Sequence, residues 1–554
     1  TLIVTLDTAA VFADSRYWVQ AEAELTGSGT ELVKIATANS TQHAEWLAAA
    51  LKPGDTVGVD GNVLGVAAAQ FLREALGRAG IGLRTDVDVL AEVWPERPGL
   101  PDAKVYEHRA PQAPLPRAAK LAAVREAMSR HGATHHFVST VDDIAWLFNL
   151  RGADVAYNPV FLAHALIERD PANGVRLFVG AGKVDAAVQA SLAADGVRLE
   201  PYAQAGSALA VLPASSVLLV DPRRVTHGLL ANVAAGIKVV EAINPSTLFK
   251  SRKTEAEAVH VRETMEQDGA AMCDFYAWFE QALGHERITE LTIDEKLSAA
   301  RAKRPGFVGL SFGTIAAFNA NGAMPHYRAT RESHAVIEAA SGEGGLLLID
   351  SGAQYLGGTT DITRVWPIGT ITAEHRRDYT RVLKGTIALS RTRFPRGTLS
   401  PMLDAIARAP LWEQGLDYGH GTGHGVGYFL NVHEGPQSIS RTIPDANMAM
   451  EPGMITSVEP GLYRPGRWGV RIENLVMSVP AASLGGNGST EFGEFLEFET
   501  LTLCPIDTRC IERSLLRDDE IAWLNAYHAT VRARLAPRVD GPAKAWLIAR
   551  TEPI

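Results

Sequence analysis

Short apolar runs alternate with Ala-rich amphipathic stretches along roughly the first 240 residues. TLIVTLD at residues 1–7 and DTVGVD at 55–60 have the composition of strands, whereas AEWLAAAL at 44–51 and GVAAAQFLREAL at 65–76 place apolar residues at helical spacing. The alternation returns after a proline-rich segment, with a helix expected at 118–132 and strands at 133–140 and 215–221. Such an order of strands and helices is typical of α/β layers.

A different pattern begins near residue 244. Thr254 and Glu257 have capping-box spacing ahead of a long amphipathic helix, and strand and turn patterns then predominate to about residue 505. We therefore predict an N-terminal α/β domain at 1–112, a second α/β domain at 116–243 and a third domain at 244–554. HRAPQAPLPRAAK, with three prolines, is the expected linker between the first two domains.

Composition narrows the classes of partner. The chain of 554 residues has a net charge of −10 and no long basic block, which argues against a nucleic-acid partner. Its three cysteines are too few for a disulfide framework or a Cys-rich zinc site, so we expect a reducing compartment, the cytoplasm. No apolar run is long enough for a membrane helix, and we expect no membrane partner.

Candidate chemistry begins with two aspartates in LLLIDSGAQYLGGTTDITRVW. An apolar strand ends at Asp350, a glycine-containing turn follows, and Asp361 begins the next strand. A hairpin centred on Tyr355 and Leu356 would set the two aspartates directly opposite each other, with Cβ atoms about 5 Å apart. Two facing carboxylates repel each other unless a cation lies between them or one holds a proton.

Two glutamates and a glycine-rich loop complete the set. MITSVEPGLYRPGRWGVRIENLVMS predicts two strands around a Pro/Gly turn, with Glu459 at the end of one and Glu473 on the other. GHGTGHGVG, at residues 419–427, contains His424 among glycines that allow backbone and ligands to approach closely. Four carboxylates and one imidazole can hold two divalent cations about 3.5–4 Å apart, an arrangement that activates a water for hydrolysis.

Each residue alone has an ordinary structural explanation. An aspartate at a strand end is usually a turn former, and Glu473 could belong to a solvated strand face. A single histidine is more often a core or surface residue than a ligand, and HGTGH could be a simple loop. The combination indicates a metal site more strongly than any member. Its mostly oxygen ligands favour Mn²⁺, with Zn²⁺ or Co²⁺ as alternatives.

These motifs together resemble the pita-bread metallopeptidases, and specifically the large, three-domain form of aminopeptidase P (Xaa-Pro aminopeptidase). HGTGHGVG, NVHEGP, LLIDSGAQYLGGTTDITR, SVEPGLY and VRIEN carry the resemblance in the catalytic region. VFADSRYWVQAEAEL, VDDIAWLFNLRGADVAYNPVF and the C-terminal segment 495–528 extend it over essentially the whole chain. It implies two creatinase-type α/β domains followed by a pita-bread catalytic domain with a C-terminal extension. The family's opening strand and helices have no counterpart before TLIVT, so the first domain is expected to lack them.

The resemblance assigns roles to residues of this chain. The implied ligands of two metal ions are Asp350, Asp361, His424, Glu459 and Glu473, with Asp361 and Glu473 bridging the ions. Glu459 is also the implied proton shuttle between the attacking water and the leaving proline nitrogen. His326 and His433 would hydrogen-bond the substrate and the tetrahedral intermediate, His420 would support the site, and Arg471 could orient Glu473 or a neighbouring carboxylate. His420 and Arg471 could equally be structural.

The implied reaction is removal of the N-terminal residue from peptides with proline at the second position, by attack of a metal-bridging hydroxide. Proline lacks an amide N–H, which defeats most peptidases. Two alternatives stay open: a prolidase that cleaves only Xaa-Pro dipeptides, and a non-peptidase pita-bread protein that binds its partner without hydrolysis. The chain length and C-terminal extension favour the aminopeptidase, and intact ligands argue against the binding protein. The resemblance also implies a homodimer.

Overall fold

The computed structural model describes residues 1–37, 40–338, 344–485 and 488–554. By the density of internal contacts the chain divides into two compact units, one made of Thr1–Ala38 with Ser251–Ile554 and the other of Asn39–Lys250. In the described parts of the chain, no helix is both long and apolar enough to cross a membrane.

The unit Asn39–Lys250 is built on a six-stranded mixed sheet with the order β11-β10-β9-β7-β12-β13. Its strands are β7 (His135–Val138), β9 (Ala163–Glu168), β10 (Val175–Val179), β11 (Val197–Pro201), β12 (Val217–Val220) and β13 (Lys238–Glu241). Its main helices are α2 (Gln42–Ala50), α3 (Val66–Arg78), α5 (Arg117–Arg130), α6 (Val141–Phe148), α7 (Ala186–Ala194) and α8 (Ala205–Ala210). Parallel pairs at both ends and antiparallel pairs in the centre confirm the predicted α/β class.

The unit formed by Thr1–Ala38 and Ser251–Ile554 begins with a small sheet from the N-terminus. β1 (Leu2–Val4), β2 (Ala9–Ala13) and β3 (Thr30–Lys34) form this sheet in sequence order, and α1 (Trp18–Leu25) connects β2 to β3. The connection between the parallel strands β2 and β3 therefore passes through a helix, as parallel strands require. The short segment between β2 and α1, residues 14–17, includes Tyr17, whose hydroxyl contacts His326.

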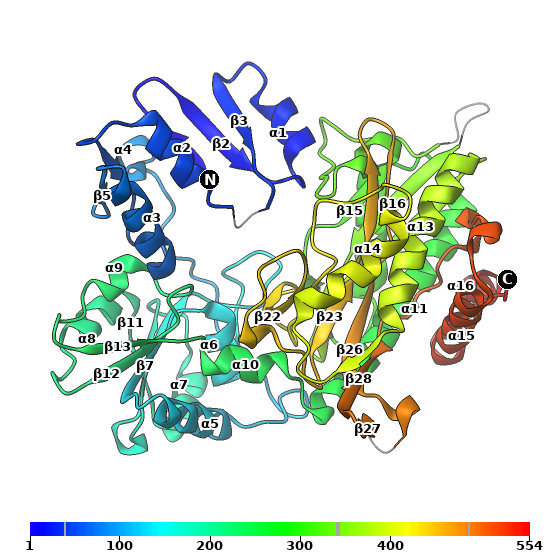
Figure 1. Cartoon of the computed structure of the whole chain (residues 1–554). Helices are drawn as coiled ribbons and strands as arrows, with labels where there is room; N and C mark the ends of the chain where they lie inside the picture. The colour runs from blue at the N-terminus through cyan, green and yellow to red at the C-terminus, as the bar shows by residue number, and fades with distance from the viewer. Residues whose placement is uncertain (38–39, 339–343, 486–487) are drawn as a thin grey trace. The chain divides into compact units, whose positions relative to one another are not determined.

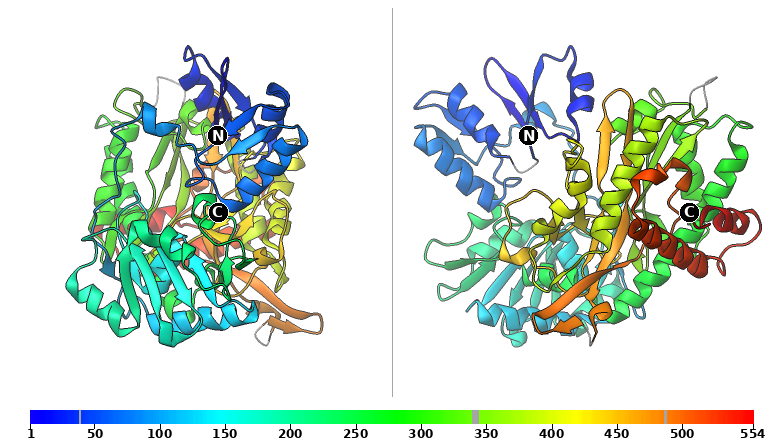
Figure 2. Two further views of the ribbon diagram at one scale, coloured as in Figure 1. Left: turned by 90° about the vertical axis from the view of Figure 1, so that its left-hand side faces the viewer. Right: turned by 45° about the vertical axis from the view of Figure 1, so that its right-hand side comes forward.

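The rest of this unit consists of antiparallel sheets with helices packed against them (Figures 1 and 2). One sheet contains β15 (Ile315–Phe318), β16 (Gly345–Ser351) and β19 (Ile362–Ile368); another contains β14 (Phe307–Leu310), β17 (Ala353–Tyr355) and β18 (Gly358–Thr359). The largest has the order β20-β28-β26-β23-β21-β22, with β27 (Ser489–Thr490) beside β28. Its strands are β20 (Arg393–Pro395), β21 (Gly423–Gly425), β22 (Glu434–Ile439), β23 (Ile455–Val458), β26 (Asn474–Pro480) and β28 (Gly493–Thr500), while β24 (Gly461–Arg464) and β25 (Trp468–Arg471) form a separate hairpin.

The long helix expected after residue 254 is confirmed as α11 (Glu255–Ala282), with Thr254 and Glu257 forming the capping box. The expectation that strands predominate up to residue 505 is wrong in part, because α12 (Glu290–Ala302), α13 (Ala373–Ser390) and α14 (Asp404–Trp412) lie in this region. In α13 the apolar residues Tyr379, Leu383 and Ile387 recur at 3-4 spacing and are buried, which favours a helix.

The hairpin that carries the two aspartates is shifted by two residues from the predicted register. Asp350 pairs with Thr363, not with Asp361, and the turn lies at residues 356–357, between Tyr355 and Gly358. The reason is that Gly357 takes a turn position packed against α11, where a Cβ would come within 3.1 Å of the Thr264 side chain. A shift of two preserves the side-chain face, so Asp361 lies diagonal to Asp350 on the same side.

The C-terminal segment completes the core of the unit. α15 (Asp518–Leu535) and α16 (Gly541–Arg550) lie side by side in both figures, and α16 packs on α11. Trp546 of α16 stacks on Tyr276 of α11 with ring centroids 5.5 Å apart, and Trp366 of β19 lies 5.8 Å from the same indole. The strand that follows Asp361 therefore rests on side chains from the end of the chain.

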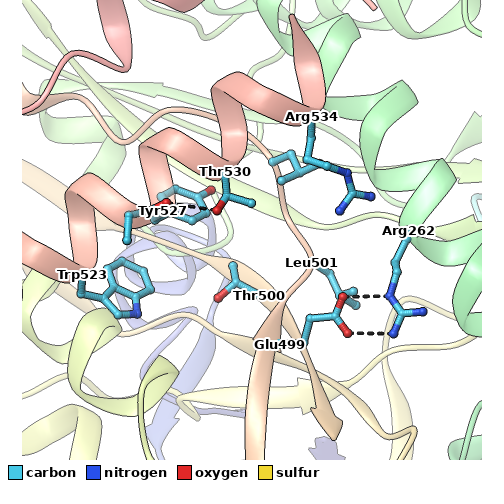
Figure 3. Close-up of a pocket in the computed structure, with 10 residues that line it drawn as sticks. Arg262, Glu499, Thr500, Leu501, Trp523, Tyr527, Thr530 and Arg534 are labelled. Atoms are coloured by element: carbon cyan, nitrogen blue, oxygen red, sulfur yellow. Dashed lines mark hydrogen bonds and ion pairs between the residues drawn. The ribbon is translucent and has the colours of Figure 1, made fainter. Parts of the chain in front are cut away.

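A cavity of about 310 Å³ lies between the C-terminal helix α15, β28 and α11 (Figure 3). Trp523 and Tyr527 stack along one wall with ring centroids 5.5 Å apart, and Arg262 is held by Glu499 at 2.8 Å. None of the predicted site residues lines it. This cavity is therefore separate from the carboxylate cluster.

Candidate metal centre

The two aspartates lie at neighbouring ends of β16 and β19. Asp350 is the last residue but one of β16, and Asp361 immediately precedes β19. Both side chains are buried, with residue exposures of 8% and 5%. A turn-forming aspartate is normally solvated. Burial of both therefore argues against the ordinary explanation for either residue.

The two glutamates continue the ladder between β23 and β26 beyond its last pair. That pair is Val458 with Asn474, so Glu459 follows β23 and Glu473 precedes β26 at the next opposed positions. Glu473 is 1% exposed, which excludes a solvated strand face, and its Oε2 accepts a hydrogen bond from Thr363 Oγ1 at 2.8 Å. Thr363 belongs to β19, so this bond joins the glutamate hairpin to the strand that follows Asp361.

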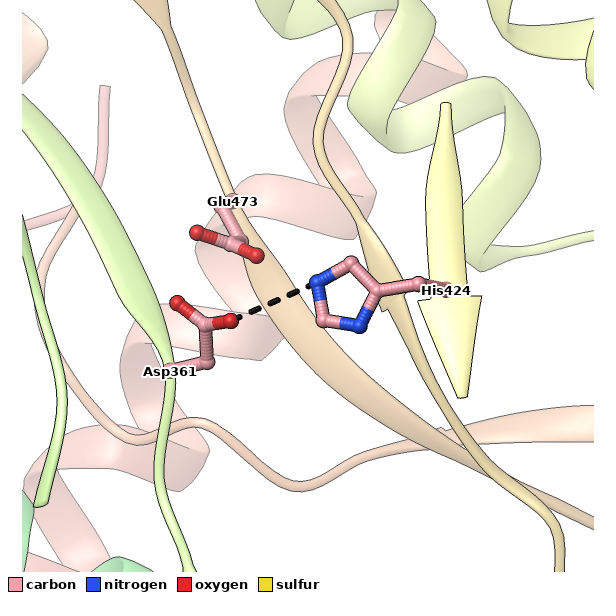
Figure 4. A group of neighbouring side chains, drawn as sticks. All are labelled: Asp361, His424 and Glu473. Atoms are coloured by element: carbon pink, nitrogen blue, oxygen red, sulfur yellow. Dashed lines mark ion pairs between the residues drawn. The ribbon is translucent and has the colours of Figure 1, made fainter. Parts of the chain in front are cut away.

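His424 enters the cluster from β21, with Asp361 and Glu473 beside it (Figure 4). Its Nδ1 lies 2.9 Å from the Gly425 carbonyl oxygen, which can only accept, so Nδ1 carries the proton and Nε2 presents a lone pair. Nε2 lies 3.5 Å from Asp361 Oδ2 and 3.6 Å from Glu459 Oε1. Ligand atoms of Asp361, His424 and Glu473 all lie within 4.8 Å of one another.

The electrostatics of this cluster fit a cation. Burial, followed by the charge of Asp350, raises the pKa of Asp361 well above its usual range, and burial followed by the charge of Asp361 does the same for Glu473. Burial also raises the pKa of Glu459. Asp350 Oδ1 is buried with no hydrogen-bond partner in the described structure. Converging buried carboxylates are stabilised by a positive ion between them, and this oxygen-rich set suits hard divalent metals.

A chain of hydrogen bonds holds Asp350 from behind. Arg471 donates to Asp350 Oδ2 at 2.5 Å and to the Tyr463 hydroxyl at 2.8 Å. The Tyr463 hydroxyl lies 2.8 Å from His420 Nε2, while His420 Nδ1 lies 2.7 Å from the Gly421 carbonyl oxygen and therefore carries the proton. Arg471 thus binds the neighbouring carboxylate of Asp350 rather than Glu473, and three hydrogen bonds connect His420 to Asp350 through Tyr463 and Arg471.

The other two histidines flank the carboxylates. The rings of His433 and His424 have centroids 4.2 Å apart, and the proximity of His424 lowers the pKa of His433 to about 3. His326 Nδ1 lies 2.7 Å from the Tyr17 hydroxyl, and burial lowers the pKa of His326 to about 4. Both imidazoles are neutral at pH 7, so each can donate one hydrogen bond and accept one.

All predicted site residues come together in one unit, but the sequence reasoning missed several neighbours. Tyr463 ends the SVEPGLY motif, but nothing in the sequence indicated that it would bind Arg471 or His420. Arg16 and Tyr17 lie more than 300 residues away in sequence from His326, and the charge of Arg16 contributes to the lowered pKa of His326. Their only signal was the VFADSRYW segment, because nothing in local pattern predicts a contact over that separation.

Comparisons with known protein families match most of the chain. Residues 259–479 match metallopeptidase family M24, and residues 494–554 match the C-terminal region of peptidase M24. Residues 1–93 and 96–257 each match a creatinase/prolidase N-terminal domain. A probable Xaa-Pro aminopeptidase P from Sordaria macrospora is 37% identical over 571 residues, covering 100% of this chain and 91% of its own length. The chain belongs to the Xaa-Pro aminopeptidase P family of metallopeptidases.

Other members of the family and its relatives agree. Aminopeptidase P2 of Arabidopsis thaliana is 36% identical over 589 residues, covering 100% of this chain and 81% of its own length. The X-prolyl aminopeptidase of Caenorhabditis elegans, described as a cytosolic enzyme with a di-nuclear active site, superposes with a TM-score of 0.92 at 30% identity, covering 100% of this chain and 90% of its own. The prolidase from Pyrococcus horikoshii shares the fold over 70% of this chain and 99% of its own, with a TM-score of 0.52 at 22% identity. The predicted fold class, two creatinase-type domains and a pita-bread catalytic domain, is thereby confirmed.

Proposed function

We propose that this metallo-aminopeptidase hydrolyses the bond between the first residue and proline at the N-terminus of peptides. The observation that carries the proposal is the convergence of Asp350, Asp361, His424, Glu459 and Glu473, with their acceptor atoms facing one another and Asp350 Oδ1 unpartnered. These five side chains would hold two divalent cations, for which we propose Mn²⁺. When bound, the cations would polarise the scissile carbonyl and make a water nucleophilic near neutral pH.

Glu459 is proposed to move the proton in this reaction. Its pKa is raised by burial, which suits a carboxylate that takes a proton from the attacking water and then gives it to the proline nitrogen as the C–N bond breaks. The Ser457 hydroxyl donates to Glu459 Oε1 at 3.3 Å and can hold that oxygen in place. Proton transfer to nitrogen is essential here because an unprotonated prolyl amine is a poor leaving group.

His326 and His433 are proposed to hydrogen-bond the substrate and the tetrahedral intermediate from either side of the carboxylates. Both are neutral at pH 7, and His433 is exposed at the surface of the site, where a peptide can reach it. Tyr17 fixes one nitrogen of His326, which leaves the other for substrate. Arg471, Tyr463 and His420 are proposed to act only through Asp350, by holding its carboxylate.

The test is release of the first residue from a tripeptide Xaa-Pro-Yaa by protein reconstituted with Mn²⁺. Xaa-Ala-Yaa and the dipeptide Xaa-Pro serve as matched substrates, and protein treated with a chelator serves as the blank. We expect cleavage of the Xaa-Pro-Yaa tripeptide to Xaa and Pro-Yaa only. Cleavage of the dipeptide alone would make the protein a prolidase, and cleavage of neither would favour a binding protein. The cytoplasmic location and the homodimer predicted from the sequence stay proposals alongside this function.

A further inference from the structure

A buried ammonium group, that of Lys253, lies beside the segments that carry His424 and His433. His424 belongs to β21, and His433 directly precedes β22. The side chain of Lys253 has no exposed surface, and neither has that of Glu434. Lys253 Nζ lies 2.5 Å from Glu434 Oε1, and it donates to the Val426 carbonyl oxygen at 2.5 Å and to the Ser251 carbonyl oxygen at 3.3 Å. A buried cation therefore contacts both segments at once.

These acceptors mark a break in the sheet. β21 and β22 pair His424 with Ser438 but Gly425 with Glu434, so the register jumps between two consecutive residues of β21. Val426 follows this break on one side, and Glu434 follows His433 on the other. An interrupted ladder leaves these parts of β21 and β22 without the regular hydrogen bonds that would fix the distance between the strands. The ammonium group supplies donors to both sides of the interruption.

The backbone of Lys253 is itself fixed. Its N–H donates to the Gly453 carbonyl oxygen at 2.9 Å, and the next residue, Thr254, caps α11. Gly453 has a φ of 82°, and a Cβ there would lie 2.3 Å from the Lys253 carbonyl oxygen, so the close approach requires glycine. Lys253 therefore lies immediately before the N-cap of a 28-residue helix, with its backbone held by Gly453.

We propose that Lys253 is a positioning residue, which fixes the loop of His433 against the strand of His424 by binding Glu434 and the Val426 carbonyl together. The 4.2 Å separation of the two imidazole rings is the geometry that it would maintain. The role for catalysis rests on the proposed function of His433 toward the substrate. The effect on geometry does not depend on that function.

The experiment compares Lys253→Met, Glu434→Gln and the double variant. Lys253→Met removes the cation beside a buried carboxylate and is expected to fold poorly, whereas the double variant removes both charges and is expected to recover the parental melting temperature. In the double variant we expect kcat on Xaa-Pro-Yaa to fall by about 10- to 100-fold, as on loss of other supporting contacts, while two Mn²⁺ ions per chain still bind by isothermal titration calorimetry. Recovered stability without recovered kcat separates positioning from folding.

Lys384→Met is the matched control. Lys384 Nζ lies 2.6 Å from Glu520, whose side chain is 2% exposed, and 3.0 Å from the Leu515 carbonyl oxygen, so the pair has the same chemistry away from the two histidine loops. The Lys384→Met substitution is expected to lower the melting temperature and to leave kcat of the folded protein unchanged. If the double variant does not fold, Glu434→Gln decides the matter, with an expected fall in kcat of about 10-fold.

A crystal structure of the same folded variant gives a readout without activity. We expect the rings of His433 and His424 to separate beyond the 4.2 Å found here. Parental kcat with unchanged ring separation would overturn the proposal. If the parent protein does not cleave the tripeptide, the proposed function fails, and the ring separation alone then tests the positioning role.

Discussion

At the scale of single residues, the site is a cluster of acceptors held together against their own repulsion. Asp361 and Glu473 each have a strongly raised pKa because burial and neighbouring carboxylates oppose their ionisation. Cations bound there would reverse the balance, since each carboxylate would then face positive charge. The same residues would thus destabilise the metal-free fold and stabilise the metal-bound fold.

Asp361→Asn tests this directly. Without metal, loss of one repelling carboxylate is expected to raise the melting temperature of the chelated protein. With Mn²⁺ present, loss of the ligand is expected to abolish Mn²⁺ binding and to lower kcat/KM by on the order of 10³-fold, about 4 kcal/mol of transition-state stabilisation. Melting curves with and without chelator, together with tripeptide hydrolysis, measure both effects. Full activity in this variant would contradict the assignment of the ligand.

Proton release tests the raised pKa values. In the metal-free fold Asp361, Glu459 and Glu473 retain protons to higher pH than in the unfolded chain, so their contribution to stability is present below the ordinary carboxyl pKa and is lost as pH rises through the raised values. Mn²⁺ must displace these protons. Its affinity is therefore expected to rise with pH, by about tenfold per pH unit for each proton released. Calorimetric titrations in two buffers of different ionisation enthalpy count the protons, and a count of zero would contradict the account.

Much of the site could be predicted from residue types and their positions. Carboxylates at strand ends and a histidine among glycines identified the acceptor cluster, because such residues have little use in a core. Lys253 and Tyr17 could not be predicted in the same way. Lys253 precedes a helix, where a charged residue is unremarkable in sequence, and only its complete burial reveals a role. Tyr17 reaches His326 only through the tertiary fold.

At the scale of elements, the paired strands β16 and β19, and β23 and β26, position the proposed ligands. The C-terminal helices pack against these strands. Buried Arg364 of β19 donates to the Glu473 carbonyl oxygen at 2.6 Å and to the Cys504 carbonyl oxygen and the Tyr527 hydroxyl at 2.8 and 2.9 Å. The strand next to Asp361 is thus bonded both to the backbone of another proposed ligand and to the C-terminal segment. Removal of that segment would take away the acceptors that Cys504 and Tyr527 provide and leave part of the buried guanidinium group without hydrogen bonds.

Trp546→Ala tests the support that α16 gives. The indole is 6% exposed and packs on Tyr276 and Trp366, so its loss is expected to create a cavity and to lower the free energy of unfolding by about 3–5 kcal/mol. Ile548→Ala on the same helix is the control, since Ile548 is 40% exposed and should change stability by less than about 0.5 kcal/mol. Denaturant titration measures both. Equal effects would show that α16 does not complete the core.

The sequence predicted elements more reliably than their registers. The hairpin that carries Asp350 and Asp361 was predicted from its apolar strands and glycine turn. The predicted register was wrong by two residues, because Gly357 packs on α11 and sets the position of the turn. The helix α13 was not predicted, although its Thr372 cap and apolar 3-4 spacing are present in the sequence. Tertiary contact decided the register of the hairpin, whereas the local pattern already held the signal for α13.

At the scale of the whole molecule, metal held by the proposed ligands would act on one unit only. The five proposed ligands all belong to the unit Thr1–Ala38 with Ser251–Ile554, and none to Asn39–Lys250. A ligand stabilises only the unit whose folded state it binds. The two units are therefore expected to respond differently to Mn²⁺.

Hydrogen exchange with mass spectrometry measures this difference. At about 100 times its dissociation constant, Mn²⁺ is expected to raise the protection of the most slowly exchanging peptides from β16 and β26 by about 2.7 kcal/mol and to leave those from β9 and β10 unchanged. The Asp361→Asn protein is expected to show no change in either set. Equal protection of both units in the parent would mean that the chain opens as a single cooperative body, against this expectation.

The central claim is that Asp350, Asp361, His424, Glu459 and Glu473 hold two metal ions. The most direct measurement is a crystal structure of protein loaded with Mn²⁺, with anomalous scattering recorded at an energy above the manganese edge. The account predicts two anomalous peaks about 3.5–4 Å apart, each within bonding distance of these side chains, with Asp361 and Glu473 touching both. A single peak, or peaks away from these residues, would contradict it.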